Sequence, residues 1–282
     1  MVSCEGRVQA GAHAAERDPA RGVVQLKLVT EPTRRDARAD VTPIIAALKK
    51  SGFPLQTRVE REIHARYTSG WRVLASEQPW RSEDGDQFID LIAICGTVVL
   101  VIECKKAQER SLLFLRPVGP ETTGKGRKCA VWHFEANRAA GSWFVVEIVN
   151  IDLGPESYRA EFCVSANNGA KRLLEQDARP VVSAAGVFVE PPFPTTHQLG
   201  RAFFLPVIVT TASLYTLRYD PTEISLETGS FDKLDPKRIE PIPWVRFHKT
   251  LTTNADSVAR TVFVVNSAAL PAFLDEISGA LA

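Results

Sequence analysis

The chain has 282 residues, of which 45% are hydrophobic and 24% are charged, and its formal net charge at pH 7 is +1. This length and composition are typical of a globular protein with one large domain or two small ones. The near-zero net charge excludes binding to nucleic acid through the field of the whole molecule, so such binding would require a local groove.

The cysteines and the apolar runs of the sequence bear on its location. Five cysteines are scattered without CxxC spacing, which indicates free thiols in a reducing cytoplasm. The longest uncharged apolar run, residues 91–102, is shorter than the roughly 20 residues that span a bilayer. The N-terminus lacks the apolar core of a signal peptide. We therefore expect a cytoplasmic protein that does not insert into a membrane.

Residues 1–41 differ in composition from the rest of the chain. They are rich in Ala, Arg, Asp and Pro and hold one short apolar segment, VVQLKLV. This composition predicts an N-terminal arm that is partly disordered or forms an edge strand. No internal repeat or linker divides residues 42–282, so we expect them to form a single domain.

Two helices are predicted at the start of this domain. The first has Thr42 as its N-cap and Pro43 at its first position, continues through IIAALKK, and ends at Ser51-Gly52. The second lies in PLQTRVEREIHARY, where the apolar residues recur at helical spacing.

Strands follow these helices in direct succession. WRVLASEQPW predicts one strand, and residues 87–94 and 97–105 predict two more, joined at Cys95-Gly96. Residues of about 110–165 read as an irregular insertion that holds short strands at AVWHF and SWFVVEIVNI. The hairpin of residues 87–105 is apolar on both faces up to its charged end, which is typical of the centre of an α/β sheet.

Helices and strands are also predicted in the C-terminal part. A helix is predicted in NNGAKRLLEQDA, and Pro180 should break or kink it. FFLPVIVTTASLYTLRYD predicts two strands, PWVRFHKTL another, and SAALPAFLDEISGAL a closing helix.

The most hydrophobic stretch, FIDLIAICGTVVLVIECKK at residues 88–106, is interrupted by Asp90, Glu103 and Lys105 and ends with Lys106. An isolated buried charge costs several kcal/mol or more unless it is paired or bound to a metal. A two-residue turn at Cys95-Gly96 would place Asp90 opposite Val101. Because side chains alternate along a strand, Asp90, Glu103 and Lys105 would then share one face of the hairpin, whereas a three-residue turn would reverse this result.

Two carboxylates and a lysine on one face suit a specific chemistry. Carboxylates bind hard divalent cations, and Mg²⁺ accepts one or two of them together with waters and a substrate phosphate oxygen. A nearby lysine can orient the water that attacks phosphorus and offset the developing negative charge. The pattern therefore indicates hydrolysis of a phosphodiester bond.

FIDLIA followed by IECKK resembles the PD-(D/E)XK nuclease superfamily. The resemblance covers about residues 53–110, with Asp90 as the first acid and Glu103 and Lys105 as the E-x-K element. Ile89 replaces the proline of the family's name, at a position that varies widely. The resemblance implies a restriction-endonuclease-like fold, with a central mixed β-sheet flanked by helices and a core order of helix, three strands, helix and a further strand.

The resemblance also implies roles for individual residues. Asp90 and Glu103 would bind Mg²⁺ or Mn²⁺, with the backbone carbonyl of Cys104 as a further ligand, and Lys105 would be the catalytic lysine. An acid on the preceding helix often completes such sites. Glu60 and Glu62 are both candidates, and one sequence does not choose between them.

Three classes of function are open at this point. The first is a Mg²⁺-dependent nuclease, an endonuclease or exonuclease, that acts on DNA and is compatible with a homodimer. The second is a catalytically inactive nuclease-fold protein that binds nucleic acid or acts as a scaffold, in which Asp90 and Lys105 form a structural ion pair. The third is a different metal-dependent hydrolase. The residues predicted to contact nucleic acid are Arg246, Lys249, Lys125, Arg127 and Lys128.

Overall fold

The computed structural model describes residues 41–82, 85–107, 111–118, 128–137, 143–155, 158–165, 174–190, 200–252 and 257–281. The predicted N-terminal arm lies outside these residues, apart from Val41. Thr42–Ala282 form one compact unit. No helix within the described residues is long and apolar enough to cross a membrane.

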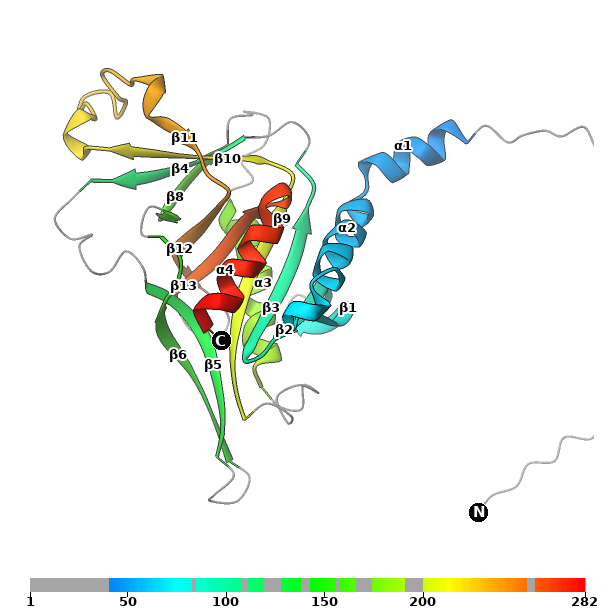
Figure 1. Cartoon of the computed structure of the whole chain (residues 1–282). Coiled ribbons are helices and arrows are strands. Elements are labelled where there is room, and N and C mark those ends of the chain that lie inside the picture. The colour runs from blue at the N-terminus through cyan, green and yellow to red at the C-terminus, as the bar shows by residue number, and fades with distance from the viewer. Residues whose placement is uncertain are drawn as a thin grey trace, which may run out of the picture. The chain divides into compact units, whose positions relative to one another are not determined.

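Four α-helices are present in the described part of the unit. Helix α1 is Thr42–Lys50 and helix α2 is Phe53–His64, close to the predicted bounds. Helix α3 is Leu174–Phe188 and helix α4 is Leu270–Leu281. Figure 1 shows α2 and α4 on one side of the sheet and α3 behind it.

Nine strands form the larger sheet, which is mixed. Its order is β1-β2-β3-β9-β13-β12-β7, and β5 pairs with β6 and β9. The pairs β1/β2 and β2/β3 are antiparallel, whereas β3/β9 and β9/β13 are parallel. The strands are β1 Arg72–Ser82, β2 Gly85–Cys95, β3 Val98–Lys105, β5 Lys128–Asn137, β6 Trp143–Asp152, β7 Arg159–Ala160, β9 Arg201–Thr210, β12 Trp244–Thr252 and β13 Ser257–Asn266.

A smaller sheet of four strands completes the fold. Its order is β11-β10-β4-β8, with β10 parallel to β4. The strands are β4 Ser111–Pro117, β8 Phe162–Ser165, β10 Ser213–Tyr219 and β11 Ile239–Pro241. The segment predicted as an irregular insertion therefore supplies strands to both sheets, and β5 extends the large sheet by pairing with β9.

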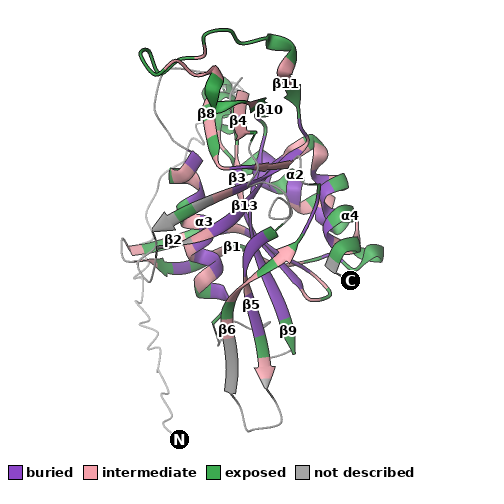
Figure 2. Cartoon of the chain, turned by 90° about the vertical axis from the view of Figure 1, so that its left-hand side faces the viewer, coloured by how far each residue is buried: buried purple, intermediate pink, exposed green. Residues whose placement is uncertain are grey.

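Both faces of the large sheet are buried at its centre. One face packs against α3 through Ile92, Val99 and Val101. The other packs against α2 and α4 through Leu91, Leu100 and Ile102. The central strands consequently read as nearly continuous apolar runs, as expected for strands covered on two sides, and Figure 2 shows the buried residues gathered there. The predicted α/β fold, with a mixed sheet flanked by helices, is confirmed at this level.

The structure differs from the sequence prediction at two places in the C-terminal half. Pro180 does not break its helix, since α3 continues to Phe188. A proline inside a helix loses one backbone hydrogen bond, and the buried α3 residues beyond it, among them Val181 and Phe188, offset that loss. A strand that was not predicted, β13 at Ser257–Asn266, lies between β9 and β12.

Candidate active site

The site is built on the hairpin of β2 and β3. The pairing runs from Leu91 with Ile102 to Cys95 with Val98, so the turn is Gly96-Thr97 and not Cys95-Gly96 as predicted. Gly96 has φ 56°, a conformation that glycine adopts without steric cost and that tight hairpin turns require.

The correct turn shifts the pairing by two residues. Asp90 therefore lies beside Glu103 and not opposite Val101. Because the side-chain period of a strand is two, the shift keeps Asp90, Glu103 and Lys105 on one face, as predicted. This is the face that packs against α3 further along the hairpin.

Asp90 is held in place by the main chain of β3. Its Oδ2 accepts a hydrogen bond of 2.6 Å from the backbone N–H of Cys104. Burial raises the pKa of Asp90, the Cys104 hydrogen bond opposes this, and the negative charge of Glu77 raises the pKa further. A buried carboxylate with a raised pKa is stabilised in its charged form by a nearby cation.

Glu103 and Lys105 form an ion pair two residues apart on β3. Lys105 Nζ donates to Glu103 Oε1 at 2.6 Å. The Lys105 side chain is 35% exposed and the Glu103 side chain is 17% exposed. Burial raises the pKa of Glu103, and so does the Asp90 carboxylate, whereas Lys105 lowers it. The structural ion pair thus involves Glu103, not Asp90 as the alternative hypothesis had it.

Glu77 is a fourth charged residue of the site, and it was not predicted from the sequence. It lies on β1 between Ser76 and Gln78, which pair with Leu91 and Ile89, so it is the β1 neighbour of Asp90. Its φ of 50° is in the left-handed region, which costs a non-glycine residue about 1–2 kcal/mol. A register shift earlier in β1 sets the face that Glu77 occupies, and local sequence does not announce such a bulge.

Replacing Glu77 tests this strain. Glu77→Gly should raise the free energy of unfolding by about 0.5–1 kcal/mol, because glycine adopts φ 50° freely and because one charge that raises the pKa of Asp90 is removed. The measurement is urea denaturation of the metal-free protein. Gln78→Gly, one position along the same strand, is the control and should lose about 0.5–1 kcal/mol. Equal losses in both variants would contradict the strain.

The two acids predicted on the preceding helix lie elsewhere. Helix α2 packs on the face of the sheet opposite to Asp90. Glu62 forms ion pairs with Arg58 and Arg66, and Glu60 accepts a hydrogen bond of 3.2 Å from Ser76 Oγ. The structure therefore does not bring Glu60 or Glu62 to the carboxylate pair.

Helix α2 reaches the site through a different residue. Gln56, only 7% exposed, donates from Nε2 to the backbone carbonyl of Asp90 at 3.2 Å. Gln56 thereby fixes the main chain that carries the first carboxylate. The sequence could not assign this role, because it does not encode which face of a sheet a helix covers.

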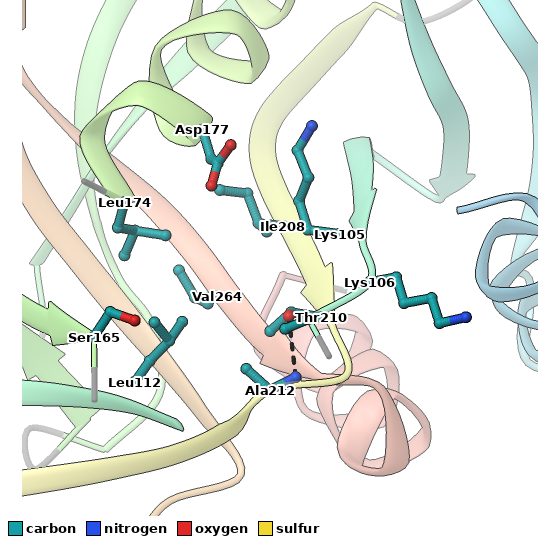
Figure 3. Close-up of a pocket in the computed structure, with 11 residues that line it drawn as sticks. Lys105, Lys106, Leu112, Ser165, Leu174, Asp177, Ile208, Thr210, Ala212 and Val264 are labelled. Atoms are coloured by element: carbon teal, nitrogen blue, oxygen red, sulfur yellow. Dashed lines mark hydrogen bonds between the residues drawn. The ribbon is translucent and has the colours of Figure 1, made fainter. Parts of the chain in front are cut away.

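A pocket adjoins Lys105 at the carboxyl ends of the parallel strands β3 and β9 (Figure 3). Lys105 and Thr210 are paired neighbours at these two ends. Asp177 of α3 lines the pocket from the helix, and its charge raises the pKa of Glu103. Open α/β sheets bind ligands at the carboxyl ends of their strands, and this pocket lies at such an end.

The residues predicted to contact nucleic acid lie in different surroundings. Arg246 is 1% exposed and donates to the carbonyl of Pro155, so it does not face a groove, and this prediction was wrong. Both faces of β12 are covered, and the strand has no polar outer side at this position. Lys128 is exposed at the start of β5. Lys249 belongs to β12, its side chain lies outside the described residues, and so do Lys125 and Arg127.

The donor atoms at the hairpin suit a hard cation. Two carboxylates and a main-chain carbonyl are the oxygen ligands that Mg²⁺ accepts. The Cys104 thiol is unsuited to ligation, since burial raises its pKa far above the usual value and keeps it protonated. The described residues contain no group of three Asp, Glu, His or Cys side chains placed to hold a metal. A cation here would therefore complete its shell with the Cys104 carbonyl, water and substrate.

The arrangement offers two acids of raised pKa that a cation would stabilise, one ammonium group beside them, and a pocket next to that ammonium group. Such a set can bind a phosphodiester, neutralise its charge and position water. In comparisons with protein-family models, curated proteins and solved structures, nothing matched the chain.

Proposed function

We propose that the protein is a Mg²⁺-dependent nuclease with a restriction-endonuclease-like core that hydrolyses phosphodiester bonds in DNA. The observation that carries this proposal is the juxtaposition of Asp90, Glu103 and Lys105 on one face of the β2/β3 hairpin. Both carboxylates have raised pKa values. Two adjacent buried carboxylates are costly without a cation, which favours a site made for binding one.

The order of elements supports the same proposal. Helix α2 precedes β1, β2 and β3, and α3 precedes β9, which pairs in parallel with β3. This is the order of helix, three strands, helix and a further strand that the family resemblance implies. The strands β4 to β8 are inserted between β3 and α3.

Each residue has a defined part in the proposed reaction. Asp90 and Glu103 would hold Mg²⁺ together with the Cys104 carbonyl, and the ion would polarise the phosphate and lower the pKa of bound water. Lys105 orients the attacking water and offsets the negative charge that develops on phosphorus. Gln56 keeps the Asp90 main chain in position through its hydrogen bond.

A metal-dependence assay separates this proposal from an inactive scaffold. Plasmid DNA and single-stranded RNA are incubated with the protein in Mg²⁺, Mn²⁺ or EDTA, and the products are resolved on gels. We expect cleavage of DNA with either ion and none with EDTA. Cleavage of neither substrate under all three conditions would favour the inactive nucleic-acid-binding alternative, in which Lys105 and Glu103 serve only as an ion pair.

A further inference from the structure

We propose that the junction of α1 and α2 is the surface on which the phosphate backbone of a nucleic-acid strand docks before cleavage. The surface consists of Lys49, Lys50, Phe53 and Lys106, hereafter the junction surface. This inference rests on the proposed nuclease function. The junction surface takes the role in strand binding that was predicted for Arg246, which is buried.

The junction lies next to the candidate site. A Cβ atom added to Gly52, the residue before α2, would be 3.9 Å from the carbonyl oxygen of Cys104. The backbone N–H of that same Cys104 binds the Asp90 carboxylate. Lys50 is two residues before Gly52, and Phe53 directly follows Gly52. Both residues are therefore only one or two positions along the chain from the residue that contacts Cys104.

Lys106 is the first residue after β3. Consecutive residues of an extended chain point to opposite faces. Figure 3 shows the two side chains pointing apart. Both residues line the pocket, but Lys105 points to the catalytic face and the Lys106 side chain points away from it, toward the side that α2 covers. Lys49, Lys50 and Lys106 are all exposed, and no ion pair of theirs occurs within the described residues.

The surface combines these cations with an exposed aromatic ring. Phe53 is 61% exposed although it begins α2, whose other large apolar residues Leu55, Val59 and Ile63 are buried. Helix α1 has no buried residue, and Ile44 and Leu48 are 67% and 52% exposed. Cations that track phosphates, with an aromatic ring on which a base can stack, are the usual elements of a surface that binds a nucleic-acid strand.

Charge complementarity decides the choice of partner. Asp90, Glu103 and Glu77 repel a polyanion, and a molecule with a net charge of +1 offers little overall attraction. Cations near the acids are therefore needed to hold a strand, and the junction lysines lie near the end of β3 that carries Glu103, on the face that α2 covers. A nine-residue helix with no buried face is also marginally stable alone, so contact with the strand would stabilise α1.

The test measures binding without cleavage, by fluorescence anisotropy with labelled oligonucleotides in EDTA. Lys50→Gln with Lys106→Gln should reduce the slope of log affinity against log salt by about 1.4 for a single strand and about 1.8 for a duplex. The control is Lys233→Gln with Lys237→Gln, an equal charge change on exposed residues at the far end of the unit (Figure 1). The control should keep the slope of the unmodified protein.

A second variant tests the aromatic part of the surface. Phe53→Ala should weaken binding of the single strand by about fivefold or more and leave the salt slope unchanged, because no charge is removed. Both single-stranded and duplex oligonucleotides of one sequence are used, so that stacking and pure phosphate contact are separated.

The outcomes are distinguishable from failure of the proposed function. If the unmodified protein neither binds nor cleaves DNA, the nuclease proposal and the docking surface both fail. If it binds and cleaves while the Lys50/Lys106 variant keeps the slope of the control, only the docking surface is overturned. If Leu48→Glu converts a dimer to a monomer in sedimentation while affinity is unchanged, α1 serves a second copy of the chain, and the docking surface is again overturned.

Discussion

Asp90→Asn is expected to lower the rate of metal-dependent cleavage by about 10³-fold or more, because a bound cation supplies several kcal/mol of transition-state stabilisation and each 1.4 kcal/mol is a factor of ten. The asparagine keeps the shape of the side chain, and its oxygen can still accept from Cys104 N–H. The loss should therefore come from cation binding and not from unfolding. Asp232→Asn, at an exposed position of the loop after β10, is the matched control and should retain full activity.

The same substitution should stabilise the metal-free protein, with a defined dependence on pH. Burial raises the pKa of Asp90 in the folded state, so the folded state binds the proton more tightly than the unfolded state does. The contribution to stability is present below the unfolded pKa of about 4 and is lost as pH rises through the raised pKa. Asp90→Asn removes this loss. From pH 4 upwards, the free energy of unfolding should accordingly decrease less with pH in the variant than in the unmodified protein. The same dependence on pH in both proteins would contradict the assignment.

Lys105→Met is expected to lower kcat by a factor of about 10² while the affinity for DNA changes little, because the ammonium group acts on charge that develops in the transition state. Methionine preserves the length of the chain, and the lysine is only partly buried, so folding should be unaffected. Lys106→Met is the matched control. It removes the same charge one residue away, and we expect it to raise KM and leave kcat unchanged.

A pH profile gives the Lys105 prediction a second readout. Lys105 lowers the pKa of Glu103, so its removal should raise that pKa. Because the carboxylate must be ionised to hold a cation, the acidic limb of the cleavage profile should move to higher pH in Lys105→Met. Equal losses of rate and affinity, with an unmoved profile, would make Lys105 a phosphate contact only.

The hairpin explains why the core of the site could be predicted from sequence. Its charged residues are separated by even numbers of positions within a long apolar run, and a face assignment depends only on whether the pairing register is odd or even. The turn was placed one residue too early, at Cys95-Gly96, and the pairing therefore shifted by two. An even shift preserves the face, so the grouping of the three charges did not depend on the exact turn.

Other parts of the site depended on features that local sequence does not encode. Glu77 reaches its face through a register irregularity in β1, and Glu60 and Glu62 are excluded because α2 covers the opposite face. Arg246 was expected to contact nucleic acid, but β12 is covered on both sides and Arg246 is buried. Which side of a sheet a helix covers, and whether a strand is central, follow from the packing of the whole chain. In contrast, β13 was predictable, because its TVFVV run is rich in β-branched residues.

Titration calorimetry with Mg²⁺ tests the central claim most directly, since the claim is that Asp90 and Glu103 together hold a divalent cation. The titration compares the unmodified protein with Glu103→Gln and with Asp90→Asn at a pH where both carboxylates are ionised. We predict one binding site in the unmodified protein and loss of that binding in both variants, with weaker binding as the pH falls through the raised pKa values. The same Mg²⁺ affinity in all three proteins would contradict the account.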